Sequence, residues 1–269
     1  MQGVIRGIVV FFALAGTVSL IAQAPQQATP QAPAQAAAPT AAAAQSLTAD
    51  EVVARYIDAI GGKDAISRVK SISMEMSVQL MGTDAPGTTW VVDGVGYRNE
   101  TLFNDSKIIQ VYTPKGGWQV NSMAGISDPT PLPDDQYKAG KEQIYVGGQF
   151  YNYAAKGSKI ELLAKDNDTY KIKLTTKDNL TTTYTIDAAT FLVRSAARQG
   201  KMQDQDVDIT TTYSDYKKTD TGYTIPTSIG VDFGGQFQIT IAVKKVEVNK
   251  TIDPAIFDMP AAAPAAPKS

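Results

Sequence analysis

The chain has 269 residues and a formal net charge of −2, from 25 Lys and Arg against 27 Asp and Glu. The basic residues are scattered along the sequence, so they predict no surface that follows nucleic-acid phosphates. Cysteine and histidine are both absent, which excludes disulfides, a thiolate nucleophile and every imidazole-based catalytic site. No cofactor is predicted.

The N-terminus has the pattern of a signal peptide over residues 1–24. An uncharged apolar stretch follows Arg6 and ends at Ile21, and Ala22-Gln23-Ala24 supplies small residues at the spacing of a cleavage site. Ala22 is an alternative site, because Pro25 follows Ala24 directly. The stretch is shorter than the roughly 20 residues that a membrane-spanning helix needs. We therefore expect export across an inner membrane, a periplasmic location and a mature form without a transmembrane span.

Two segments of low complexity flank the rest of the sequence. Residues 25–45 are almost all Ala, Gln, Pro and Thr, and residues 261–269 are similar. Such a composition cannot bury enough side-chain surface to offset the entropy of ordering. We predict a disordered linker, either a mere spacer or a tether to a partner, and a disordered tail. Residues 46–260 are predicted to form one domain with a sizeable core.

The domain is predicted to open with a helix. Thr48 and Glu51 form a capping box, an apolar stripe from Val52 to Ile60 follows, and Gly61-Gly62 ends the helix. A short second helix is expected over 63–69. A third is expected over 134–144, which follows a proline, is rich in charge and lacks strand alternation.

The remaining segments have the period of two that is typical of strands. They cover 72–80, 88–93, 97–103, 107–113, 118–121, 159–164, 169–176, 181–187, 191–199, 206–216, 223–231 and 236–248. Their connections are too short for crossover helices, so the sheet should be antiparallel. About eleven strands with two or three helices predict a mainly β (α+β) protein with a strongly curved sheet. The sheet could close into a barrel, or stay incomplete with helices covering the open side.

No catalytic or metal site stands out from the sequence. Ser67 and Lys70 match the S-x-x-K motif of penicillin-binding enzymes, but the other two elements of that pattern are incomplete, so we reject it. Asp204, Asp206 and Asp208 would share one face of a strand and could hold calcium, but a solvated strand face is favoured. A hydrolase that works through paired carboxylates remains an alternative, although no pair is evident.

The early strands carry Met and other apolar residues that could line one concave face. Methionine adapts to ligands of variable shape, so such a face could accept chains of variable shape, but on composition alone an ordinary packed core is favoured. The predicted cavity residues are Met74, Met76, Val78, Leu80, Trp90, Val92, Ile109, Val111 and Trp118.

Several segments resemble those of LolA-like outer-membrane lipoprotein-sorting proteins. The resemblance lies at both ends of the domain and in its middle, over Leu47–Val53 with Tyr56, Ala59–Gly62, Tyr97–Glu100, Ile109–Tyr112 with Gly117-Trp118, Thr190–Val193, Tyr213–Tyr216 and Asp253–Pro260. It implies an incomplete β-barrel with helices as a lid around an apolar cavity for lipoprotein acyl chains.

The resemblance implies a periplasmic, non-enzymatic carrier of lipoprotein acyl chains, phospholipid or another amphiphile toward the outer membrane. Inner- and outer-membrane transfer proteins would be its partners. The better-known carriers have a basic residue and a proline where this chain has Val91–Gly94, so the resemblance does not extend to the residues linked to handover from an inner-membrane transporter. Two alternatives remain: an envelope-interaction module with a packed barrel, and the carboxylate-dependent hydrolase.

Overall fold

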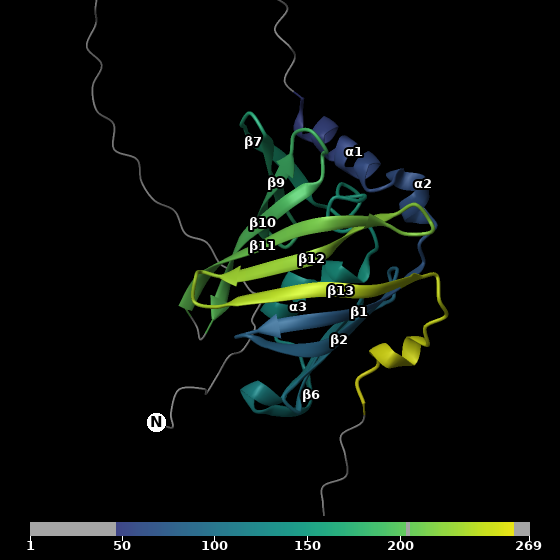
Figure 1. The fold of residues 1–269 in the computed structure, drawn as a ribbon, viewed down its shortest axis with the longest axis vertical. Helices are drawn as coiled ribbons and strands as arrows, with labels where there is room; N and C mark the ends of the chain where they lie inside the picture. Colours follow the sequence, from purple (N-terminus) through teal and green to yellow (C-terminus); the bar gives the residue numbers. More distant parts are fainter. Residues whose placement is uncertain (1–46, 203–204, 261–269) are drawn as a thin grey trace, which may run out of the picture.

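The computed structural model describes residues 47–202 and 205–260 (Figure 1). The expectations for the signal peptide, the linker and the tail concern residues outside these ranges. The described residues form one antiparallel sheet of 13 strands, in the order β6-β5-β4-β3-β2-β1-β13-β12-β11-β10-β9-β8-β7. The sheet is curved and its two edges, β6 and β7, do not pair, so the predicted incomplete barrel is confirmed.

Except between β6 and β7, consecutive strands pair as hairpins, and the first strand pairs with the thirteenth in the middle of the sheet. Their bounds are β1 Ser71–Leu80, β2 Thr83–Val92, β3 Gly96–Phe103, β4 Ser106–Thr113, β5 Gly116–Asn121, β6 Ile126–Pro131, β7 Lys159–Lys165, β8 Thr169–Thr175, β9 Thr181–Asp187, β10 Val193–Met202, β11 Gln205–Lys218, β12 Thr224–Phe233 and β13 Gln238–Val248.

The strand count of about eleven was slightly low, mainly because β6 was not predicted. Its sequence, Ile-Ser-Asp-Pro-Thr-Pro, contains two prolines and has no alternation of buried and exposed residues. Proline removes a donor from a sheet ladder and is tolerated at an edge, which is where β6 lies. The strand is therefore set by its neighbour β5 rather than by its own pattern.

Helices α1 (Ala49–Ala59) and α2 (Gly62–Ser67) cover one end of the curved sheet (Figure 1). The predicted capping box is present, since the Thr48 hydroxyl accepts from the Glu51 amide and the Glu51 carboxylate accepts from the Thr48 amide. Gly61, between the helices, has a φ of 117°, and a Cβ there would lie 2.4 Å from the carbonyl oxygen of Gly222. This turn therefore requires glycine.

The largest core cluster lies beneath these two helices. It joins buried side chains of α1 and α2 to those of the strands at that end of the sheet, including Val52, Val53, Ile57, Ile66, Ile72, Ile172, Leu174, Ile186 and Ile225. Apolar burial stabilises at roughly 25 cal/mol per Å². This half of the curved sheet is thus a packed core.

The third helical segment crosses the open side of the sheet. α3 (Asp134–Gly140) continues into a 3₁₀ turn, η2 (Lys141–Ile144), so the helix predicted over 134–144 is confirmed. A Cβ at Gly140 would lie 2.1 Å from the Tyr112 ring, so the helix rests directly on β4. In Figure 1 the helix lies behind the sheet.

The C-terminal segment lies on the outer face of the sheet and contains the 3₁₀ turn η3 (Pro254–Phe257). Phe257 is buried against β3, β4 and β5, and its carbonyl oxygen accepts a hydrogen bond of 2.9 Å from Trp118 Nε1. The Arg98 guanidinium donates to the carbonyl oxygen of Ile256. A second core, on the opposite face from the helices, is formed in this way.

Candidate functional site

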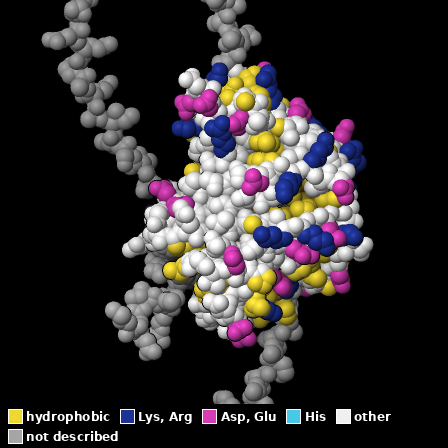
Figure 2. Space-filling model, viewed as in Figure 1, with side chains coloured by type: hydrophobic (Ala, Val, Ile, Leu, Met, Phe, Trp, Pro, Cys, Tyr) yellow, Lys and Arg dark blue, Asp and Glu magenta, His cyan; other side chains and the backbone are white. Residues whose placement is uncertain are grey.

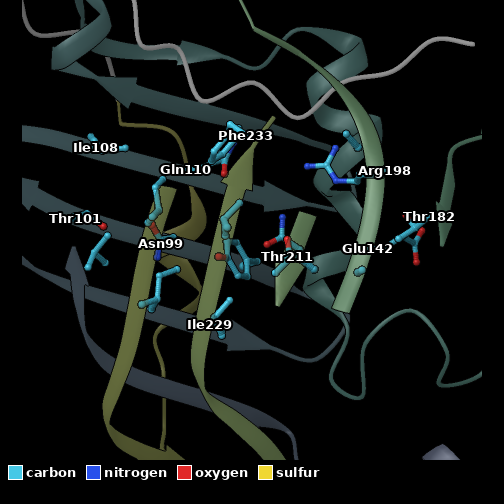
Figure 3. Close-up of a pocket in the computed structure, with 18 of the residues that line it drawn as sticks. Asn99, Thr101, Ile108, Gln110, Glu142, Thr182, Arg198, Thr211, Ile229 and Phe233 are labelled. Carbon is cyan, nitrogen blue, oxygen red and sulfur yellow. The ribbon is translucent and has the colours of Figure 1, made fainter. Parts of the chain in front are cut away.

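A cavity of about 450 Å³ lies on the concave face, between the sheet and the α3–η2 segment (Figure 3). Its volume is within the range of small-molecule sites. The lining comes from β1, β3, β4, β5, β9, β10, β11, β12 and β13, with α3, η2, Gln149 and the β8–β9 turn completing it. Strands from both halves of the sheet therefore enclose one space.

One wall of the cavity is apolar and comes from β1, β13 and β12. Strand register places these side chains in two rows, because Val78 faces Ile241, which faces Ile229, and Leu80 faces Ile239, which faces Val231. Phe233 continues the wall toward the end of β12. These positions alternate with residues such as Thr240, which is exposed on the outer face. The wall is a continuous apolar surface for a chain-like ligand.

The opposite wall, on β3, β4 and β5, carries side-chain amides. Asn99 faces Gln110, and Gln110 faces Gln119, so three amides form a row across neighbouring strands. Asn99 Nδ2 donates a hydrogen bond of 2.9 Å to the Thr89 hydroxyl, which extends the row to β2. Each amide can donate and accept. We call Asn99, Gln110 and Gln119 the amide row.

Three charged residues contribute to the lining: Lys138 and Glu142 from the α3–η2 segment, and Arg198 from β10. Burial lowers the pKa of Arg198 to about 10, while the nearby tyrosines Tyr184, Tyr213 and Tyr112 act in the opposite direction. Burial also raises the pKa of Tyr97, which lines the cavity, to about 12. Arg198 is charged and Tyr97 neutral at physiological pH.

The predicted cavity residues divide between the two faces of the sheet. Val78 and Leu80 contribute to the cavity lining, and Ile109 is among the lining residues although its side chain also packs in the core cluster of Val111 and Trp118. Met76 occupies the same face but is buried beside Thr89, and Met74 packs against the core beneath α1 and α2. The structure thus brings only part of the predicted set to the cavity.

Trp90, Val92, Val111 and Trp118 lie on the outer face, where the C-terminal segment covers them. Register explains this placement. Trp90 faces Ser73 rather than Met74, and the row continues through Arg98 and Val111 to Trp118. A shift of one residue in a strand moves its side chains to the other face, and sequence periodicity alone does not fix that shift.

Several lining residues were not predicted. Ile229, Val231, Phe233, Ile239 and Ile241 lie in segments that were predicted as strands, and their alternation could have identified them. The amide row and Arg198 carried no such indication, because polar residues at strand positions are usually interpreted as solvent-facing.

The structure brings no support to the catalytic alternatives. The Ser67 hydroxyl donates to the carbonyl oxygen of Asp64 at 3.0 Å, within its own helix. Asp206 and Asp208 are exposed, Asp204 lies outside the described residues, and no group of three metal-ligating side chains occurs within the described ranges. Among the described residues, Glu142 is the one carboxylate in the cavity lining, whereas glycoside hydrolysis needs two.

Within residues 47–202 and 205–260, no helix has both the length and the apolar composition to cross a bilayer. The outer face of the sheet carries acidic and basic side chains interspersed with small apolar areas (Figure 2). It presents no patch of a single charge.

Comparison of the sequence with protein-family models and with curated proteins gives no match. Solved structures share the fold. A DUF1329 family protein from Desulfovibrio piger is similar with a TM-score of 0.53 and 13% identity, over 78% of this chain and 97% of that one. A LolA superfamily protein from Nitrosomonas europaea has a TM-score of 0.52 and 12% identity, over 79% and 98%.

An outer membrane lipoprotein-sorting protein domain from Vibrio parahaemolyticus is also similar, with a TM-score of 0.50 and 10% identity, over 78% of this chain and 96% of that one. The resemblance to LolA-like proteins is therefore confirmed at the level of the fold.

Proposed function

We propose that this chain is a non-enzymatic periplasmic carrier that shields an acyl chain of a lipoprotein or another lipid on its way toward the outer membrane. The observation that carries the proposal is the continuous apolar wall of β1, β12 and β13 inside a cavity of about 450 Å³. A barrel filled by its own side chains, as the envelope-interaction alternative requires, would lack such a space.

The cavity volume determines how large a ligand the cavity can hold. At the ~30 Å³ that a water molecule occupies in the liquid, about 450 Å³ holds roughly 15 non-hydrogen atoms, which is the size of one acyl chain. Removing such a chain from water is favourable by ~0.8 kcal/mol per CH₂ group, or roughly 12 kcal/mol gross. Ordering of the ligand and of the protein reduces this value. A soluble carrier for one chain is therefore energetically reasonable.

The fold shared with a LolA superfamily protein and a lipoprotein-sorting domain supports the same proposal. The proposed location rests on the predicted signal peptide over residues 1–24, which a cleaved N-terminus in the protein from its host would support.

Native mass spectrometry of the protein purified from its host, followed by lipid analysis, tests the function. A stoichiometric lipid or acylated peptide is expected. A bare polypeptide that also takes up no added lipid would favour the packed envelope module.

A further inference from the structure

Arg198 is the feature of the cavity that the shielding of an acyl chain does not require. It lies on β10, where Ala196 and Arg198 line the cavity. Figure 3 shows its guanidinium directed from the strand toward the other lining side chains. A guanidinium in the cavity lining offers hydrogen-bond donors that a hydrocarbon chain cannot use.

The surroundings of Arg198 favour a polar group of a ligand at this point. Tyr184 and Tyr213 line the cavity beside it, and both act on its pKa. Burial is the main cause of the raised pKa of each tyrosine, so both hydroxyls keep their proton and can donate a hydrogen bond. Guanidinium and hydroxyl donors together suit an oxyanion.

The two walls of the cavity orient a ligand. The apolar wall on β1, β12 and β13 suits a hydrocarbon chain, and the amide row on β3, β4 and β5 suits hydrogen-bonding groups. The cavity of about 450 Å³ is of the size of one acyl chain with a small head.

We infer that the ligand is a single-chain amphiphile with an oxyanion head, a carboxylate or a phosphate. Arg198 binds this head, the amide row contributes further hydrogen bonds, and the chain lies along the apolar wall. This inference rests on the proposed carrier function and adds the chemical class of the ligand.

Three ligands with the same chain separate the contributions: dodecanoate, dodecyl phosphate and dodecanol, each titrated into the delipidated full chain by calorimetry. Hydrogen bonds to charged groups predict that the better oxyanion binds about tenfold to hundredfold more tightly than the alcohol. The preference between dodecanoate and dodecyl phosphate identifies the head.

Arg198→Met should reduce the affinity for both oxyanions by about tenfold or more and leave the affinity for dodecanol unchanged. Arg198→Lys, which keeps the charge, should restore part of the loss. Arg194→Met is the matched control on the same strand, because Arg194 is half exposed and forms an ion pair with Asp187 outside the cavity lining.

Equal affinities for the alcohol and both oxyanions, or an Arg198→Met variant that loses affinity for all three ligands alike, would overturn this inference and leave the carrier function standing. Failure of the wild-type chain to bind any of the three would overturn both.

Discussion

Lys141 Nζ lies 2.6 Å from Asp178 Oδ2, an ion pair that joins the η2 turn to the β8–β9 turn on the other side of the cavity. The two side chains are only 17% and 20% exposed, so water screens the pair less than it screens a surface pair. Residues on both sides of this contact line the cavity. The pair therefore ties the α3–η2 segment to the β8–β9 turn across the cavity, and we call this ion pair the latch.

Asp178→Asn is expected to accelerate ligand dissociation by roughly fivefold to tenfold, because the latch loses an interaction of about 1 kcal/mol. Stopped-flow release of a fluorescent fatty acid measures this rate. Glu161→Gln is the matched control, since Glu161 pairs with Lys173 at the same distance of 2.6 Å but in an exposed position. Equal dissociation rates in the two variants would show that the Lys141–Asp178 ion pair does not slow ligand release.

Ile241→Glu should abolish the uptake of acyl chains, because it places a carboxylate in the centre of the apolar wall. Thr240→Glu, one residue earlier on β13, points outward and should bind like the wild type. Binding of a fluorescent fatty acid, with circular dichroism to check the fold, compares the two. Normal uptake by a folded Ile241→Glu variant would contradict the assignment of this wall.

Phe257→Ala is expected to lower the free energy of unfolding by about 3 kcal/mol, because the ring is 2% exposed and fills the core between β3, β4 and β5. Urea denaturation measures the change. Met259→Ala should have an effect below about 0.5 kcal/mol, since Met259 is 49% exposed. Similar midpoints for both variants would show that the C-terminal segment adds little stability.

Asp187 predicts a dependence of stability on pH. Its pKa is lowered to about 2, mainly by the backbone amide of Thr190, with Arg194 and Ala189 contributing. A lowered pKa means that the carboxylate stabilises the fold fully above its unfolded pKa of about 4. This contribution is lost as the pH falls through the folded pKa of about 2.

Asp187→Asn should therefore be less stable than the wild type at pH 7, by about 1 kcal/mol, and the difference should shrink as the pH falls and vanish below about pH 2. Thermal or urea unfolding across this range measures it. Asp166→Asn is the control, because the Asp166 carboxylate lies 3.9 Å from Lys171 Nζ at an exposed site. A difference that persists unchanged at low pH would rule out the carboxylate as its source.

The sequence predicted those features that depend on neighbouring residues. The capping box of Thr48 and Glu51 is satisfied within one turn, so it identified α1 correctly. Alternation identified most strands for the same reason. Predicting the cavity residues requires the register between strands, and that register is set by turns and distant contacts. Trp90 and Trp118, which were predicted in the cavity, lie on the face opposite to Val78. Arg198 could not be recognised, because its place in the cavity depends on strands that are far apart in the sequence.

The pairing of β1 with β13 determines when the cavity can form. Ile72 faces Val248, so the middle of the sheet joins residues near opposite ends of the domain. During synthesis, Val78 and Leu80 emerge long before Ile239 and Ile241, their partners in the apolar wall. Until then β1 has an unpaired edge and exposed apolar side chains, a combination that favours aggregation. A chain that ends before β13 would therefore lack half of the apolar wall, so the cavity can form only once synthesis has passed Val248.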